Sequence, residues 1–128
     1  MLLFVGGTLL IAYAWGVIDT KTATDQAARQ AVRTYVGAPD PAVAASTADQ
    51  AADSTLAGYG RDPADASVAL VSGQWARCAR ITIEVSYPAP LFHVPWLGSY
   101  GTGETVHSRE SSTVDAYRSG LPGTATCA

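Results

Sequence analysis

The first 36 residues of the chain, Met1–Val36, read MLLFVGGTLLIAYAWGVIDTKTATDQAARQAVRTYV, and they decide the fold. Leu2–Ile18 contains no charged residue. As a helix rising about 1.5 Å per residue, this run would be ~26 Å long, slightly less than the hydrocarbon thickness of a typical bilayer. No helix breaker separates it from the polar, alanine-rich sequence that follows. We therefore expect one helix, half in lipid and half in water.

A cleaved signal peptide is the alternative interpretation of the apolar run. Ala12–Ala14 has the small-x-small pattern of a cleavage site, but no basic region precedes Leu2. Tyr13 and Trp15 lie where amphipathic rings favour the membrane interface. We expect the run to be retained as a membrane and assembly helix, in which the apolar residues are Leu2, Leu3, Phe4, Val5, Leu9, Leu10, Ile11, Tyr13, Trp15, Val17 and Ile18.

The second half of the helix carries a stripe of mostly small residues. Ala23, Ala27, Ala31 and Tyr35 are four residues apart, which places them on one helix face and predicts a packing surface. Gly37, followed by Pro39, ends the pattern, so the helical segment is residues 1–37. The stripe fits either a tethered domain whose helix packs on its own core or a pilin-like helix that also packs in an assembly.

Residues 38–128 are predicted to form an extracytoplasmic α+β head domain. Asp40 before Pro41 is an N-cap signal, and the apolar spacing that follows predicts a second helix to about Ala57. Beyond it, SVALVS at 67–72 reads as a short strand. The head should therefore combine this helix with a small antiparallel sheet of about three strands.

Two further strands complete the predicted sheet. In RCARITIEVSYPAP, residues 77–90, apolar side chains alternate with polar ones. Pro88 and Pro90 should end this strand. ETVHSRESSTVDAY, residues 104–117, reads as a polar third strand. The intervening residues form a predicted loop that is unusually apolar, and its possible contact residues are Phe92, His93, Trp96, Leu97 and Tyr100.

The sequence contains no pattern that predicts catalysis. The formal charge is −3, with eight Lys and Arg against eleven Asp and Glu, so nucleic-acid binding is not expected. His93 and His107 have no nucleophile, carboxylate or cysteine at a recognisable spacing. We expect a packed or interface ring at His93 and a solvated one at His107. No enzyme activity, metal or cofactor is predicted.

The two cysteines are Cys78 and Cys127. They do not form a CxxC pair and have no histidine at metal-ligand spacing. We expect one disulfide between them in an oxidising compartment. Two free thiols, or a bond from one cysteine to a neighbouring subunit, are the alternatives.

Several segments together resemble the TadE-like (TadE/TadG) pseudopilins of tight-adherence (Flp) pili, in their actinobacterial form. An apolar helix runs into an acidic residue, Asp19. AARQAVR at 27–33 is similar to the family's AAREGAR-like segment. RCARITIEVSYPAP, VPWLG at 94–98 and ESSTVDAYRSG at 110–120 follow in the family's order. The resemblance covers nearly the whole chain and rests on order and spacing.

The resemblance implies a non-enzymatic minor pilin subunit that assists initiation, assembly or adhesion of a type IV-like pilus. Its partners would be other pilin or pseudopilin subunits, the pilus assembly machinery and the membrane. It would lie in the cell membrane as a single-pass protein or in a surface pilus. A membrane-anchored or secreted adhesion module independent of a pilus is the alternative. The family's basic leader and helix glutamate are not seen, since Ala12 stands near the expected glutamate position. We expect Met1 to be a start inside the helix, and an unprocessed membrane subunit is the alternative.

Overall fold

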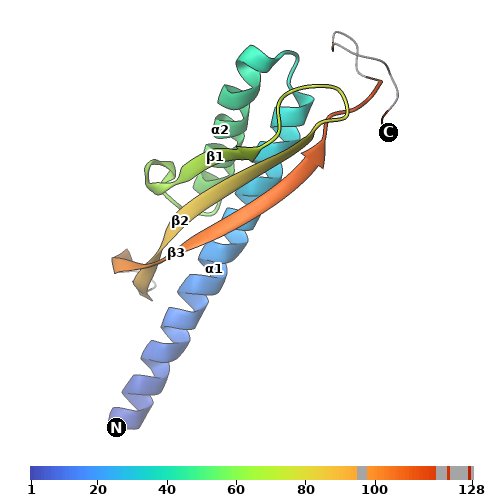
Figure 1. The fold of residues 1–128 in the computed structure, drawn as a ribbon. Helices are drawn as coiled ribbons and strands as arrows, with labels where there is room; N and C mark the ends of the chain where they lie inside the picture. Colours follow the sequence, from blue (N-terminus) through green and yellow to red (C-terminus); the bar gives the residue numbers. More distant parts are fainter. Residues whose placement is uncertain (95–97, 118–120, 122–126, 128) are drawn as a thin grey trace.

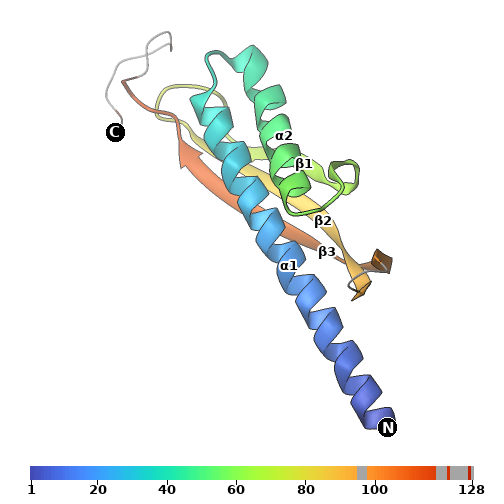
Figure 2. The same cartoon turned by 180° about the vertical axis from the view of Figure 1, so that it is seen from behind.

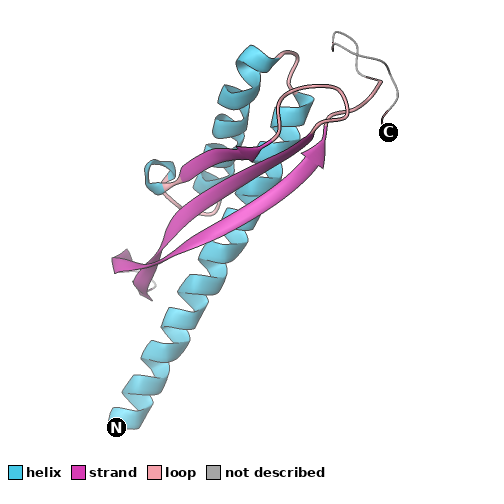
Figure 3. Cartoon of the chain, viewed as in Figure 1, coloured by secondary structure: helices cyan, strands magenta, loops and turns pink. Residues whose placement is uncertain are grey.

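The computed structural model of the chain describes residues 1–94, 98–117, 121 and 127. In chain order the elements are α1 (Leu2–Gly37), α2 (Pro41–Gly58), the short 3-10 helix η1 (Pro63–Asp65), β1 (Ser67–Ser72), β2 (Arg80–Val94) and β3 (Gly98–Thr113). Two helices are thus followed by a three-stranded antiparallel sheet, which confirms the predicted α+β fold (Figures 1 and 3).

The first helix is continuous over 36 residues, as predicted. Its first half projects away from the rest of the molecule, while its second half packs against α2 and the sheet (Figure 1). Its backbone reverses at Ala38, whose extended conformation ends the helix just before Pro39. One rigid element therefore joins the projecting end to the head.

The second helix lies antiparallel beside the upper half of α1 (Figure 2). The Asp40 carboxylate accepts hydrogen bonds from the backbone N–H groups of Ala42 and Val43, and Pro41 occupies the first helical position. The predicted cap is confirmed. One face of α2 is buried through Ala44, Ala48, Ala52 and Leu56. Because most of these side chains are alanine, the two helices can approach closely.

The sheet covers the helix pair with the apolar face of its central strand. The order is β1-β2-β3, with Val68 opposite Val85 and Ile83 opposite Glu110. The predicted inward row of β2 is buried: Ile81, Ile83, Val85 and Tyr87, extended by Ala89. Ile81, Ile83, Val85 and Tyr87 join the buried residues of α1 and α2 in one core.

The prediction that Pro88 and Pro90 end the second strand is wrong. β2 continues to Val94, and β3 begins at Gly98, so most of the predicted loop is a hairpin. β1 begins at Ser67, opposite Ser86, so beyond that point β2 is paired on one side only among the described residues. A strand with one free edge tolerates proline because half of its backbone donors need no partner. The register shifts between Pro88 and Pro90.

Candidate functional site

The candidate functional surface is the projecting half of α1, Leu2–Ile18, which we call the apolar half. Tyr13 and Val17 are half-buried. The other predicted membrane and assembly residues are exposed, and Leu2 and Leu3 are 90% and 94% exposed. By length and composition, α1 could cross a membrane. Exposure of so many large apolar side chains in one element is typical of a membrane or protein contact surface.

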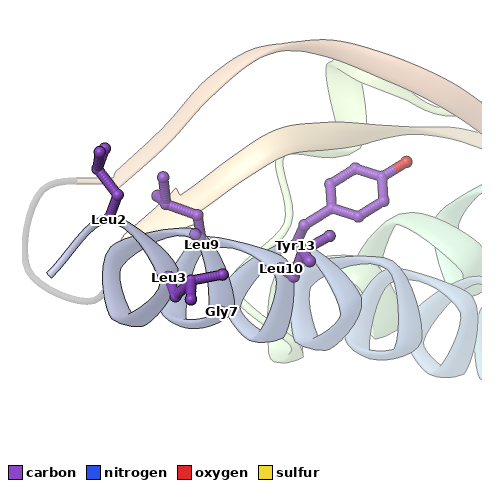
Figure 4. Close-up of a pocket in the computed structure, with 7 residues that line it drawn as sticks. Leu2, Leu3, Gly7, Leu9, Leu10 and Tyr13 are labelled. Atoms are coloured by element: carbon purple, nitrogen blue, oxygen red, sulfur yellow. The ribbon is translucent and has the colours of Figure 1, made fainter.

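A groove of about 760 Å³ lies on one side of the apolar half, lined by Leu2, Leu3, Gly6, Gly7, Leu9, Leu10 and Tyr13. Figure 4 shows the side chains of Leu2, Leu9 and Tyr13 projecting on the same side of the helix. A Cβ atom built on Gly6 or Gly7 would have no heavy atom within 4 Å beyond the local backbone. The described lining is therefore apolar, and it is open at both glycines.

The burial of α1 begins at Gly16 and follows one face. The predicted packing residues are buried: Ala23, Ala27 and Ala31 are inaccessible and Tyr35 is 8% exposed. They lie in the core formed with α2 and the sheet of the same chain. Thr20 and Thr24 share this face, and their hydroxyls donate 2.7 Å hydrogen bonds to the carbonyls of Gly16 and Thr20. This stripe therefore packs within the head.

Polar contacts surround α1 just above the apolar half, and we call them the polar collar. On the α2 side, Arg61 forms an ion pair with Asp19, the first charged residue of the chain. The Arg61 side chain is only 7% exposed, whereas that of Asp19 is 52% exposed. Arg61 also donates its backbone N–H to Leu56. The pair thus links the lower end of α2 to α1.

On the β3 side of the polar collar, Asp25 is the central group. Its carboxylate accepts hydrogen bonds from Lys21, at 2.9 Å, and from the Ser108 hydroxyl. Burial raises the pKa of the Asp25 carboxyl, but those two hydrogen bonds and the charges of Lys21 and Arg29 outweigh burial and hold the pKa below its ordinary value. One turn higher, Arg29 and Glu110 form a 3.2 Å ion pair. The collar therefore fixes α1 to the sheet.

Sequence reasoning missed the polar collar. Asp19 and Arg61 are 42 residues apart in the sequence, and Asp25 and Ser108 are 83 residues apart. No local spacing connects such residues. The sequence signals were the four-residue spacing of Lys21 and Asp25 and a sudden group of charged and hydroxyl residues directly after an uncharged run.

The outer face of the sheet brings together Glu84, Ser86, His107 and Arg109. The Ser86 hydroxyl lies 2.8 Å from Nδ1 of His107, and Oε1 of Glu84 lies 3.7 Å from the same nitrogen. A serine–histidine–carboxylate triad needs serine and carboxylate on opposite ring nitrogens, so this arrangement cannot relay a proton in that way. A hydrogen bond from Arg109 lowers the pKa of the Glu84 carboxyl. His107 is exposed, as predicted.

The structure places Cys78 and Cys127 together as a disulfide pair, with their Cα atoms 5.4 Å apart. Cys78 does not begin β2, which starts at Arg80, but lies in the preceding turn with φ +62°. Nearby, the Arg77 guanidinium donates to the carbonyls of Ala116 and Leu121. These contacts hold the end of the described chain beside the β1–β2 turn.

Of the predicted contact loop, Phe92, His93 and Tyr100 are strand positions. Phe92 pairs with Tyr100, and His93 pairs with Ser99. Trp96 and Leu97 lie outside the described residues. Among the residues that the structure describes, no group of three His, Cys, Asp or Glu side chains could hold a metal ion.

Comparisons of the chain with protein-family models, with curated proteins and with solved structures find no match.

Proposed function

We propose that the chain is a minor pilin-like (pseudopilin) subunit of a tight-adherence (Flp) type IV-like pilus. In this role it would assist pilus initiation, assembly or adhesion. The apolar half of α1 would lie in the cell membrane before assembly and among the helices of other pilin subunits afterwards. The head would remain on the extracytoplasmic side, so the protein would act by assembly and not as an enzyme.

The observation that carries this proposal is the division of α1 into an exposed apolar half and a head-packed half. Leu2, Leu3 and Phe4 are all more than 80% exposed, while Ala23, Ala27 and Ala31 are fully buried in the same helix. Transfer of exposed leucine-sized side chains out of water is worth about 1.5–3 kcal/mol each. Both a bilayer and a bundle of similar helices can provide that environment.

The polar collar supports a fixed relation between the head and the membrane surface. Asp19 and Lys21 directly follow the apolar half, and both are held by residues of the head. Charged side chains are costly at the bilayer centre and are tolerated at its edge. An apolar half inserted to its end would therefore place the collar at the interface, and the head would stand directly on the membrane.

A membrane-anchored or secreted adhesion module independent of a pilus is the second candidate. The observation that favours it is the completeness of the head: the packing stripe of α1 is covered by the chain's own α2 and sheet. An anchor alone would then account for the apolar half. The two candidates differ in whether protein or only lipid surrounds that half in the cell.

Site-specific photo-crosslinking in the native host separates the two candidates. A photoreactive phenylalanine analogue would replace Phe4 or Leu10, which are 83% and 70% exposed. We expect crosslinks to other pilin-like subunits. A matched probe at Tyr117, which is exposed on the head, controls for random collision. Crosslinks from Phe4 and Leu10 to lipid alone, in cells that assemble the pilus, would overturn the pilus proposal and favour the anchored module.

A further inference from the structure

The head carries two like-charged pairs on different sides. Arg29 and Arg33 are four residues apart on α1, and Asp49 and Asp53 are four residues apart on α2. Like charges at this spacing destabilise a helix by a few tenths of a kcal/mol. Burial and the neighbouring Asp53 carboxylate raise the pKa of Asp49. Asp49 and Asp53 form no ion pair with the described part of the chain.

The basic pair lines a polar groove of about 330 Å³ between α1 and the edge of β3. Arg29 pairs with Glu110 on one side of this groove. Arg33 is exposed and forms no ion pair with any residue in the described ranges. The groove therefore presents an unneutralised guanidinium, and an acidic occupant suits it.

The acidic pair lies on the other side of the head. α1 contacts both α2 and β3, and Figures 1 and 2 agree that α1 lies between α2 and the upper end of β3. The Arg29 side of α1 faces β3, where Arg29 bonds Glu110. A contact between the basic groove of one copy and the acidic face of α2 on another copy is therefore heterologous, so it leaves free binding sides at both ends.

Arg29 and Asp49 are at the same height along the head, and Arg33 and Asp53 lie one turn above and one turn below that level. Arg29 lies eight residues before the end of α1 at Gly37, and Asp49 lies eight residues after the start of α2 at Pro41. Only residues 38–40 connect these antiparallel helices. At 1.5 Å per residue, both charged groups lie about 12 Å below the shared top of the helix pair. Copies whose apolar halves stand in one bilayer must meet at equal height. Arg29 and Asp49 meet that condition, and Arg33 lies about 6 Å above Asp49, within reach of a long side chain.

We propose that neighbouring copies of this chain associate side by side through the Arg29–Arg33 groove of one head and the Asp49–Asp53 face of α2 on the next. This inference rests on the proposed membrane insertion of the apolar half. A contact that rests on a few exposed charges is weak in solution. Confinement of the heads in one plane with a shared orientation raises their effective concentration. Steering by opposite charges then selects this contact over others.

The test is a charge exchange in the full chain, reconstituted in phosphatidylcholine vesicles and followed by energy transfer between donor-labelled and acceptor-labelled copies. Arg33→Glu alone and Asp49→Arg alone should each weaken association about tenfold. The double variant Arg33→Glu with Asp49→Arg restores opposite charges between positions 33 and 49 of neighbouring copies, so its transfer should recover from the level of the single variants toward that of the wild type. Arg80→Glu, at an exposed position on the sheet, is the matched control and should change nothing.

The salt dependence of energy transfer is a second test of the same contact. Energy transfer of the wild type should fall when NaCl is raised to about 0.5 M, because exposed charge pairs are screened. Unchanged transfer in both single variants, or failure of the double variant to recover while its circular dichroism stays native, would overturn this inference. If heads associate as described but the photo-crosslinking experiment finds lipid alone around Phe4, the pilus proposal fails and the contact stands.

Discussion

Arg61, whose side chain is 7% exposed, forms an ion pair with Asp19, which lies 42 residues earlier in the chain and is 52% exposed. The buried guanidinium, in the segment that follows α2, thus depends on a carboxylate at the boundary of the apolar half. Loss of one partner leaves a largely buried charge without compensation, whereas loss of both does not.

Asp19→Ala should therefore lower the free energy of unfolding by about 1–3 kcal/mol, a value reduced from that of fully buried pairs because Asp19 is half-exposed. Urea unfolding of the full chain in detergent micelles measures the change. The double variant Asp19→Ala with Arg61→Met should be less destabilised than the sum of its single variants. Glu104→Ala, at an exposed position of β3, serves as the control. Strict additivity would show that the pair contributes no coupling.

Ala27→Glu should prevent folding of the head. Ala27, on α1, is fully buried in the core that α1 forms with α2 and the sheet. A glutamate there would place an unpaired charge in this core at a cost of several kcal/mol. Gln30→Glu adds the same side chain at an exposed position of the same helix and should leave the circular dichroism and thermal unfolding near the wild type. A stable Ala27→Glu protein with native near-ultraviolet signals would show that this face is solvated.

Gly73→Ala should destabilise the β1–β2 connection. Gly73 has φ +95°, and an added Cβ would collide with the Arg80 carbonyl and come within 2.9 Å of the Ile81 side chain. We expect a loss of about 2 kcal/mol or more in unfolding free energy. Gly58→Ala is the matched change, since nothing lies within 4 Å of an added Cβ there. Equal stability of the two variants would contradict the positive-φ turn.

The stability of the head should depend on acid pH through Asp25. Its pKa is lower in the folded chain than in the unfolded chain, so the unfolded state binds a proton first as pH falls. The stabilisation is present above the ordinary aspartate range and is lost as pH falls through the depressed folded pKa. Thermal unfolding between about pH 6 and pH 3 should show a smaller decline for Asp25→Asn than for the wild type. Parallel declines would mean that Asp25 makes no such contribution.

Local patterns account for the elements that the sequence predicted correctly. The Asp40–Pro41 cap, the strand at Ser67–Ser72 and the inward alternation from Ile81 to Tyr87 each depend on neighbouring residues. The extension of β2 past Pro88 could not be predicted in this way, because it depends on where β1 stops pairing. The polar collar depends on tertiary packing for the same reason.

The packing stripe shows the limit of sequence reasoning about assembly. Its small residues predict a close contact, but the same residues suit a contact inside the chain or between chains. In the structure the α2 helix and the sheet cover Ala23, Ala27 and Ala31. The surface left for partners is therefore the apolar half, together with the outer faces of the head.

The pairing of Cys78 with Cys127 provides the last prediction. The bond joins the β1–β2 turn to the end of the chain across a sequence separation of 49 residues. Closing a loop of about fifty residues lowers the conformational entropy of the unfolded chain. This loss of entropy alone would stabilise the fold by about 4 kcal/mol. The Arg77 guanidinium, which bonds the carbonyls of Ala116 and Leu121, holds the same region without covalent linkage.

Protein isolated from an oxidising compartment should be a monomer about 2 Da lighter than its reduced form. A reductant should lower the urea midpoint of the wild type toward that of the double variant Cys78→Ser with Cys127→Ser. The reductant should leave the double variant itself unchanged, because it has no thiol to release. A reducible dimer on a gel would instead assign the bond to neighbouring subunits. Two freely alkylated thiols in that sample would contradict both the bond and an oxidising location for the head.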